Sequence, residues 1–205
     1  AKKYNTEHTE LFITNEMFIN AIDDTALALE EPRLNKNSPA YYLLNKELAR
    51  QGIVVTLSGD GGDEILTGYP RHHDVHNIPG IQTDVYPMHT CDEEITEYMK
   101  SWFPIDKFTD DNMNNQLYSE TLIHLPSDFL IRNDKLGMNF SMEARFPFTT
   151  KRFREYALSI PSNFKYNKEY VKAIPRIAYD KLIPHDVLYK RKTGWKVSKD
   201  FTSRN

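Results

Sequence analysis

The clearest pattern of apolar and polar positions is a short β-branched run over residues 53–57, which follows Gly52 and leads into a glycine-rich, acidic loop. A run of this length and composition, bounded by turn residues, predicts a buried parallel strand. Upstream, the pattern predicts a helix from Asn15, as its capping residue, to about residue 30. Residues 10–14 are placed as another strand by their position more than by their pattern.

A second upstream helix is predicted from Ser38 and Pro39 to about residue 51, because a capping side chain followed by proline is typical of a helix start. Gly52 is the expected cap at its carboxyl end. Strand, helix, helix, strand fits a crossover within a parallel sheet. The predicted class is therefore α/β, with the sheet portion in residues 1–70.

Residues 71–205 are predicted to be mainly helical. A segment rich in proline and histidine at 70–90 predicts an irregular excursion. Helices are expected over residues 92–102, 112–124, 127–140 and 151–159. Thr149 and Thr150 precede the last of these, and threonine can cap a helix.

Composition narrows the class of protein without identifying it. The chain has 205 residues, of which 40% are hydrophobic and 12% aromatic, which is too rich for a disordered chain. A net charge of −3 gives no sign of the excess of basic residues that nucleic-acid-binding proteins carry. No apolar run approaches the roughly 18 residues that a membrane-spanning helix needs. Cys91 is the sole cysteine, so no intrachain disulfide can form and a reducing, cytoplasmic location is the expectation.

The loop after the predicted strand carries the candidate chemistry. It runs Ser58-Gly59-Asp60-Gly61-Gly62-Asp63-Glu64. A glycine-rich loop after a strand usually presents backbone N–H groups to an anion, yet this loop is itself acidic. A hard cation between loop and phosphate resolves the conflict, because Mg²⁺ is commonly held by one or two carboxylates plus substrate phosphates. The alternative is an ordinary surface turn, with Asp63 as the cap of the helix that follows.

Three blocks of sequence resemble the synthase domain of the asparagine synthetase family. The first is the acidic loop followed by Gly68-Tyr69; the second is Arg132-Asn133-Asp134, Met138 and Met142-Glu143-Ala144-Arg145-Phe146-Pro147-Phe148; the third is Lys172, Arg176, Leu182-Ile183-Pro184 and Arg191-Lys192-Thr193-Gly194-Trp195. The segment from His8 to Thr14 also resembles the family's third core strand. The resemblance runs from about residue 8 to residue 198.

The resemblance implies an adenine-nucleotide α-hydrolase-like, Rossmann-like parallel sheet that is incomplete here. It implies ATP and Mg²⁺ as cofactors and a small-molecule carboxylate as substrate, most simply L-aspartate, activated as an acyl-adenylate and then amidated. Ammonia would come from a glutaminase domain acting on glutamine, in a full-length homodimer. The family's upstream pyrophosphate loop and its glutaminase domain are absent from this sequence, so residues 1–205 are expected to be part of a synthase domain. The alternatives are a relative that amidates or cyclises another carboxylate, and a non-catalytic paralogue.

The resemblance also assigns residues. The metal ligands are expected to be Asp63 and Glu64. The expected ATP-binding residues are Ser58, Gly59, Gly61, Gly62, Lys172 and Arg176. The expected catalytic residues are Lys192, which would neutralise charge on the phosphates, Asp60, which would meet the incoming amine, and Glu143, which would face the acceptor pocket. Asp60 stands where asparagine synthetases often have glutamate, and this shorter side chain puts strict aspartate specificity in question.

Structural roles compete with several of these assignments. Glu143 could pair with Arg145 or Arg132. Lys172 and Arg176, four residues apart on one predicted helix face, could form a structural ion pair instead of contacting phosphate. Lys192 could be an ordinary surface lysine. The histidines His72, His73 and His76 are expected to be loop residues, because no cysteine or carboxylate stands at a recognised metal-ligand spacing from them.

Overall fold

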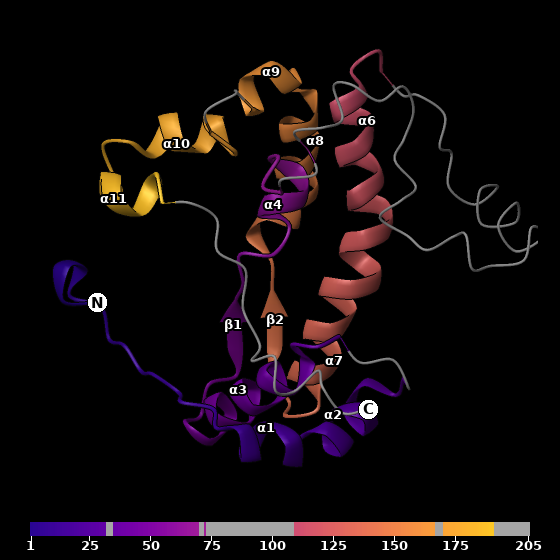
Figure 1. Cartoon of the computed structure of the whole chain (residues 1–205), viewed down its shortest axis with the longest axis vertical. Helices are drawn as coiled ribbons and strands as arrows, with labels where there is room; N and C mark the ends of the chain where they lie inside the picture. Colours follow the sequence, from indigo (N-terminus) through magenta and orange to yellow (C-terminus); the bar gives the residue numbers. More distant parts are fainter. Residues whose placement is uncertain (32–34, 70–71, 73–108, 167–169, 191–205) are drawn as a thin grey trace, which may run out of the picture. The chain divides into compact units, whose positions relative to one another are not determined.

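Helices dominate the described part of the chain, which comprises residues 1–31, 35–69, 72, 109–166 and 170–190 of the computed structural model. These residues form two units. The first contains residues 1–56 and 131–145, and the second contains residues 57–130 and 146–193, each within the described ranges. Figure 1 shows the elements in the order in which the chain passes through them. The predicted helix at 92–102 lies outside the described residues.

The first unit begins with a single turn of 3₁₀ helix, Lys2–Tyr4, and then with α1, Asn15–Asn20. The predicted strand at residues 10–14 is wrong, because these residues are not in a strand. Thr14, not Asn15, caps α1: its hydroxyl accepts a hydrogen bond from the N–H of Met17 at 3.2 Å. The extended backbone at residue 14 therefore serves to start a helix.

Two consecutive helices replace the single helix predicted to residue 30. Ala21 ends α1 and precedes α2, which runs over Ile22–Leu29. Glu30 ends α2 in the left-handed region, at a φ of 56°. Lys135 donates from its Nζ to the carbonyl oxygen of Leu29 at 2.6 Å, which satisfies one of the carbonyls that the end of a helix leaves without a partner.

The carboxyl end of α3, Ser38–Arg50, is the end that the sequence predicts. Gly52 has a φ of 79°. Its N–H donates to the carbonyl of Ala49 at 2.9 Å, and the N–H of Ile53 donates to that of Leu48 at 3.1 Å. This pair of bonds is the Schellman motif, which favours glycine because the left-handed backbone crowds a Cβ atom.

The amino end of α3 differs from the prediction by one residue. Ser38 is the first helical residue rather than the cap, and Pro39 is the second. Asn37 takes the cap position, but its side chain makes no capping hydrogen bond.

A small aromatic and aliphatic core joins α2 and α3 to α7, Ile131–Met138. Its buried members are Ala21, Leu29, Tyr42 and Leu136. Phe140 packs against Tyr42 with 5.0 Å between ring centroids, and the guanidinium of Arg132 lies 5.1 Å from the ring centre of Tyr41. This arginine, part of the second sequence block, thus stabilises the first unit through a cation–π contact.

A two-stranded parallel sheet pairs β1, Val55–Leu57, with β2, Glu143–Arg145. The N–H of Glu143 donates to the carbonyl of Val54 at 2.9 Å. The predicted strand at 53–57 is confirmed, but its predicted burial is wrong, since Val54 is 66% and Leu57 75% exposed. A parallel strand rich in apolar residues is normally covered on both faces, and described elements do not cover these side chains. The fold is mostly helical with a parallel sheet, which is compatible with the α/β class.

The second unit contains a long helical segment whose middle is a π-helix. It comprises α6, Asn112–Ser119, and then the π-helical residues Glu120–Leu130. The sequence predicts two helices separated near residue 126, and that separation is wrong. Proline has no N–H, and the wider π-helical turns around Pro126 let the helix continue past it.

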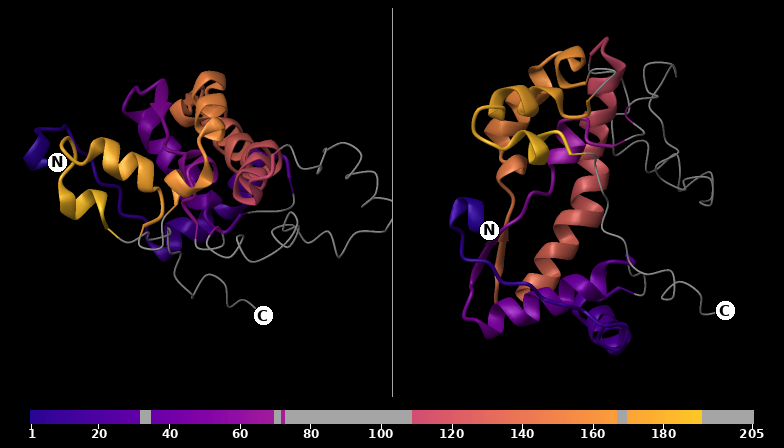
Figure 2. Two further views of the ribbon diagram at one scale, coloured as in Figure 1. Left: turned by 90° about the horizontal axis from the view of Figure 1, so that it is seen from above. Right: turned by 60° about the vertical axis from the view of Figure 1, so that its left-hand side comes forward.

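Five shorter helices complete the second unit within the described residues. They are α4, Gly62–Ile65; α8, Lys151–Ser159; α9, Ser162–Lys165; α10, Ala173–Tyr179; and α11, His185–Leu188. A 3₁₀ turn, Pro147–Thr149, precedes α8. The predicted bounds of α8 are confirmed, although the hydroxyl of Thr150 donates back to the carbonyl of Pro147 at 3.2 Å and does not cap the helix. Figure 2 shows α4, α6 and α8 together, and contacts join all three.

Candidate functional site

The acidic loop ends in a four-residue helix whose start depends on glycine. Gly61 holds the cap position of α4 at a φ of 90°. A Cβ atom at residue 61 would lie 2.8 Å from the Cγ2 of Thr149, so the loop packs closely on the 3₁₀ turn. Before this turn, Ser58 donates from its hydroxyl to Oδ2 of Asp60 at 2.6 Å. The side chain of Asp60 is therefore held within its own loop.

Asp63 is directed to a lysine that lies more than one hundred residues further along the chain. Its Oδ1 lies 2.6 Å from Nζ of Lys172. Asp63 is the second residue of α4, so its alternative role as the helix cap is wrong, since Gly61 takes that position. The Asp63 side chain is 15% exposed and that of Lys172 32%, so the ion pair is only partly buried.

Gly68 lies so close to Asp63 that any side chain at residue 68 would force Asp63 to shift. An ideal Cβ at residue 68 would lie 1.7 Å from Oδ1 of Asp63 and 2.6 Å from its Cα. The N–H of Gly68 donates to the carbonyl of Asp63 at 2.8 Å. Thr67, which is fully buried, makes this turn at a φ of 61°, a strained conformation for a β-branched residue. The first sequence block, from the loop to Gly68, thus forms one local structure around Asp63.

Glu64 has a different environment from that of its neighbour Asp63. It is buried, and its Oε1 accepts a hydrogen bond from the hydroxyl of Tyr69. Burial raises the pKa of Glu64, the Tyr69 hydrogen bond lowers it in part, and the nearby carboxylates of Asp63 and Glu120 raise it further. Expected as a metal ligand, Glu64 is directed by this geometry into the interior of the unit.

The buried environment of Glu64 also contains a histidine paired with a second glutamate. Nε2 of His72 lies 2.9 Å from Oε1 of Glu120, and both side chains are almost wholly buried. The N–H of Tyr69 donates to Nδ1 of His72 at 3.4 Å, and the two rings meet edge to face. A neutral His72 then carries its proton on Nε2 and donates it to Glu120. We call Glu64, Tyr69, His72 and Glu120 the buried cluster.

The sequence predicts His72 as a loop residue and gives no sign of its burial or of its partner. His72 is fully buried, and its partner Glu120 lies 48 residues away. No spacing signal connects residues so far apart, so only the fold reveals the pair. His73 and His76 lie outside the described residues, and no group of three His, Cys, Asp or Glu side chains within the described ranges could hold a metal ion.

Arg176 donates hydrogen bonds to three backbone carbonyls. Its Nε donates to the carbonyl of Val171 at 2.8 Å, and its other nitrogens donate to the carbonyls of Leu188 and Lys190. Its guanidinium also lies 5.7 Å and 5.5 Å from the ring centres of two tyrosines, Tyr170 and Tyr189. Lys172 precedes α10 with a φ of 54°, so the prediction that Lys172 and Arg176 share a helix face is wrong.

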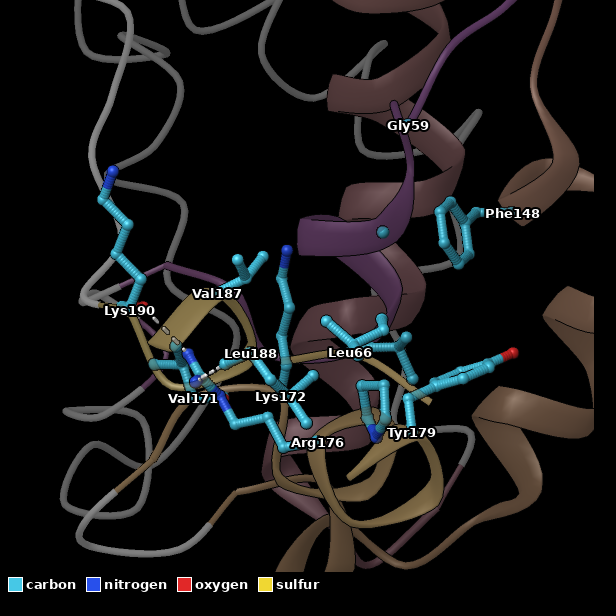
Figure 3. A pocket seen from close by; sticks show the side chains of 13 residues that line it. Gly59, Leu66, Phe148, Val171, Lys172, Arg176, Tyr179, Val187, Leu188 and Lys190 are labelled. Atoms are coloured by element: carbon cyan, nitrogen blue, oxygen red, sulfur yellow. Dashed lines mark hydrogen bonds between the residues drawn. The ribbon is translucent and has the colours of Figure 1, made fainter. Parts of the chain in front are cut away.

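A cavity of about 450 Å³ lies beside the loop and Lys172. Gly59 and Gly62 line it, together with side chains from α4, α10 and α11 (Figure 3). Lys172 extends along this cavity toward α4. The structure therefore brings five expected site residues together: Gly59, Gly62 and Asp63 from the loop region, and Lys172 and Arg176 from the third block.

The other expected catalytic residues besides Asp60 belong to parts of the chain that are described separately or are not described. Glu143 belongs to the first unit, where it is exposed on β2 and lies 3.5 Å from Nε of Arg145. Its alternative role as a partner of Arg145 is thus observed. Lys192 lies outside the described residues.

A buried lysine that the sequence does not single out supports the turn after α4. Lys165 is fully buried; its Nζ donates to Oδ1 of Asn114 at 2.6 Å, and its carbonyl accepts from the hydroxyl of Thr67 at 3.0 Å. Burial lowers the pKa of Lys165 to about 8, and the charge of Asp111 opposes that shift. Lys165 therefore holds the strained turn in place through its backbone.

Comparisons with known proteins agree with the resemblance that the three sequence blocks indicate. The family model described as asparagine synthase matches residues 1–203. The asparagine synthetase [glutamine-hydrolyzing] 3 of Bacillus subtilis (strain 168) is 25% identical over 94% of this chain and 34% of its own length. The asparagine synthetases [glutamine-hydrolyzing] of Mus musculus and Homo sapiens are each 24% identical over 95% of this chain and 30% of their own length.

A parallel strand leads into an acidic glycine-rich loop, and a carboxylate–lysine pair lies beside a cavity next to that loop; open α/β sheets commonly bind ligands in this position. The chain belongs to the asparagine synthase family. It spans about a third of the length of the relatives given above. No helix among the described residues is both long and apolar enough to cross a membrane.

Proposed function

We propose that this chain is part of a synthase domain that forms an amide from a carboxylic acid, ATP and an amine. The observation that carries the proposal is the Asp63–Lys172 pair, 2.6 Å apart, beside a cavity lined by the glycines of the loop. It is supported by membership of the asparagine synthase family. The complete domain would have an adenine-nucleotide α-hydrolase-like sheet, of which the strand that leads into the loop would be one member.

Asp63 fits a cation that takes most of its ligands from the substrate. Within the described residues no three His, Cys, Asp or Glu side chains converge on one point. Mg²⁺ is commonly bound by one or two carboxylates together with phosphate oxygens and water, and it would neutralise charge on the pyrophosphate of ATP. Asp63 would supply one carboxylate oxygen to the cation. The ammonium group of Lys172 would then contact a phosphate oxygen in place of Asp63.

The buried position of Glu64 leads us to assign it a positioning role in place of metal binding. Its carboxyl group contacts the hydroxyl of Tyr69 and lies near Glu120, inside the unit. By holding α4 on its inner side, Glu64 would fix the direction in which Asp63 points. Ser58, Gly59, Gly61 and Gly62 would present backbone N–H groups to the nucleotide.

The reaction would take place in two steps. A carboxylate oxygen of the acid attacks the α-phosphorus of ATP, the bond to pyrophosphate breaks, and an acyl-adenylate forms. An amine then attacks the acyl carbon, the bond to AMP breaks, and the amine loses one proton. Asp60, held by Ser58, would accept that proton, and Lys192 and Glu143 would meet the phosphates and the acceptor. The amine would be ammonia from glutamine, supplied within a cytoplasmic homodimer.

ATP–pyrophosphate exchange by the complete natural protein tests this proposal. With Mg²⁺ and a panel of carboxylic acids that includes L-aspartate, we expect exchange that requires one acid and stops when EDTA removes the metal. A matched Asp63→Asn protein should lose the exchange while keeping its thermal unfolding midpoint. A well-folded protein that shows no exchange with any acid would instead support a paralogue that retained the fold without the chemistry.

A further inference from the structure

Thr67, in the turn that follows α4, combines full burial with a strained backbone. Its φ of 61° lies in the left-handed region, which a β-branched residue rarely adopts. Strain of this kind persists only where the surrounding structure fixes it, and it is common at functional sites. Thr67 takes no part in the chemistry proposed above, so its conformation calls for another explanation.

The strained turn determines where Gly68 lies, and Gly68 contacts Asp63. The N–H of Gly68 donates to the carbonyl of Asp63 at 2.8 Å. A Cβ atom on Gly68 would lie 1.7 Å from Oδ1 of Asp63, the same oxygen that lies 2.6 Å from Nζ of Lys172. A change in the backbone at Thr67 would therefore move Gly68 against the carboxylate that faces Lys172.

The hydroxyl group of Thr67 holds this turn to a separate helix. Its single hydrogen is shared between two carbonyl oxygens, that of Leu66 at 2.6 Å and that of Lys165 at 3.0 Å. Leu66 is the preceding residue, whereas Lys165 lies 98 residues further along the chain and is the last residue of α9. The bond to Lys165 is thus a tertiary contact that fixes the turn after α4.

Lys165 is itself held in place by α6. Its side chain is fully buried, and its Nζ donates to Oδ1 of Asn114 at 2.6 Å. The carboxylate of Asp111 accepts hydrogen bonds from the N–H of Asn114 at 3.1 Å and from the N–H of Ser162 at 2.9 Å, so it joins the starts of α6 and α9. A buried ammonium group is costly unless polar partners satisfy it, so these contacts fix where the carbonyl of Lys165 lies.

We propose that Thr67 is a positioning residue for Asp63, because its hydroxyl, bound to the backbone of Lys165, holds the turn that directs the Asp63 carboxylate. This inference rests on the proposed function, in which Asp63 binds Mg²⁺ together with phosphates of ATP. Thr67 touches neither the metal nor the substrate and acts through Gly68. Removing a group that orients a metal ligand commonly weakens metal binding by about 10–100-fold.

The test is Mn²⁺ binding by the complete protein with α,β-methylene-ATP, which cannot release pyrophosphate. Mn²⁺ prefers the same oxygen ligands as Mg²⁺ and is detected by electron paramagnetic resonance. Thr67→Val removes the hydroxyl but keeps the β-branched shape, so the backbone strain stays the same. We expect the Kd for Mn²⁺ to rise about tenfold or more in Thr67→Val, and to stay within about threefold of the natural value in Thr67→Ser, which keeps the hydroxyl.

Thr25→Val is the matched control for the loss of a buried hydroxyl. Thr25 is fully buried in the first unit, and its hydroxyl donates to the carbonyl of Ala21. Both valine variants should lower the thermal unfolding midpoint, but Thr25→Val should leave the Kd for Mn²⁺ unchanged. The inference would be overturned by a natural Kd in Thr67→Val, by equal losses in the two valine variants, or by a natural protein that binds no Mn²⁺ with the nucleotide.

ATP–pyrophosphate exchange distinguishes a failure of this inference from a failure of the proposed function. In Thr67→Val we expect half-maximal exchange to require about tenfold more Mg²⁺, with kcat at saturating Mg²⁺ within about threefold of the natural value. An exchanging natural protein whose Mg²⁺ requirement is the same in Thr67→Val would overturn the inference and leave the proposed function intact. If the natural protein exchanges with no acid, the proposed function fails, and Mn²⁺ binding alone decides the inference.

Discussion

Asp63 and Glu64 are adjacent acidic residues on one short helix, yet they belong to different environments. Asp63 is partly exposed, faces Lys172 and lies next to the cavity. Glu64 is buried and contacts Tyr69 in the buried cluster with His72 and Glu120. Successive residues on a helix point about 100° apart, so α4 presents one carboxylate to each side.

This contrast separates two uses of a carboxylate. On the cavity side, the Asp63 carboxylate is partly exposed and has the ammonium group of Lys172 as its partner. On the buried side, the Glu64 carboxylate has a raised pKa and accepts a hydrogen bond from the hydroxyl of Tyr69, which suits a structural role. The sequence resemblance implies metal binding for both residues, and our proposal keeps that role for Asp63 and gives Glu64 a positioning role.

The largest effect should come from removing the charge on the cavity side. Asp63→Asn should lower ATP–pyrophosphate exchange by about 10²-fold or more, because one interaction with developing charge is worth that much in preorganised sites. Glu64→Gln is the matched control on the same helix and should retain exchange within about threefold, since glutamine can still accept the Tyr69 hydrogen bond. Equal losses in the two variants would show that α4 does not divide the two roles.

The next largest effect should come from breaking the buried pair. His72→Ala leaves Glu120 buried with a weakened set of partners, so we expect a loss of about 3 kcal/mol in the free energy of unfolding. Urea denaturation of His72→Ala, Glu120→Gln and the double variant would measure the coupling between them. Lys151→Gln, which breaks the exposed Lys151–Glu155 pair, should barely change stability. Additive losses at residues 72 and 120 would mean that the pair does not act as a unit.

A smaller effect, on both stability and exchange, is expected at Gly68, which lies against Asp63. Gly68→Ala places a methyl group against the backbone of Asp63, which should cost about 1–3 kcal/mol of stability and also reduce exchange by displacing Asp63. Gly59→Ala is the stability control, since nothing lies within 4 Å of the Cβ that it would add. If Gly68→Ala is as stable as Gly59→Ala, the turn around Asp63 is not closely packed in solution.

The smallest effect concerns pH. The folded pKa of Glu64 lies above its ordinary value of 4.5, so between these two pKa values the folded state binds more protons than the unfolded state. The contribution of Glu64 to stability therefore falls as pH rises from 4.5 through the folded pKa. Glu64→Gln should gain stability relative to the natural protein between pH 4.5 and 7.5, as measured by urea denaturation at both values. A constant difference between the two proteins would contradict the raised pKa.

Local patterns in the sequence predicted much of the secondary structure. The strand before the acidic loop, the bounds of α8 and the Schellman cap at Gly52 follow from residues within a few positions of one another. Such features are determined by backbone conformation and by hydrogen bonds between near neighbours, so sequence patterns can reveal them. The strand predicted at 10–14 was wrong because strand formation needs a distant partner.

The resemblance to the asparagine synthase family, confirmed by the family match, came from residues of the sequence itself. The sequence by itself thus determined the family, the loop and the identity of the candidate residues. Only the tertiary structure decided that Asp63 meets Lys172, that Glu64 turns inward, and that His72 pairs with Glu120. Each of these three outcomes depends on burial or on a partner that packing brings close. The spacing of neighbouring residues in the sequence reveals neither burial nor such a partner.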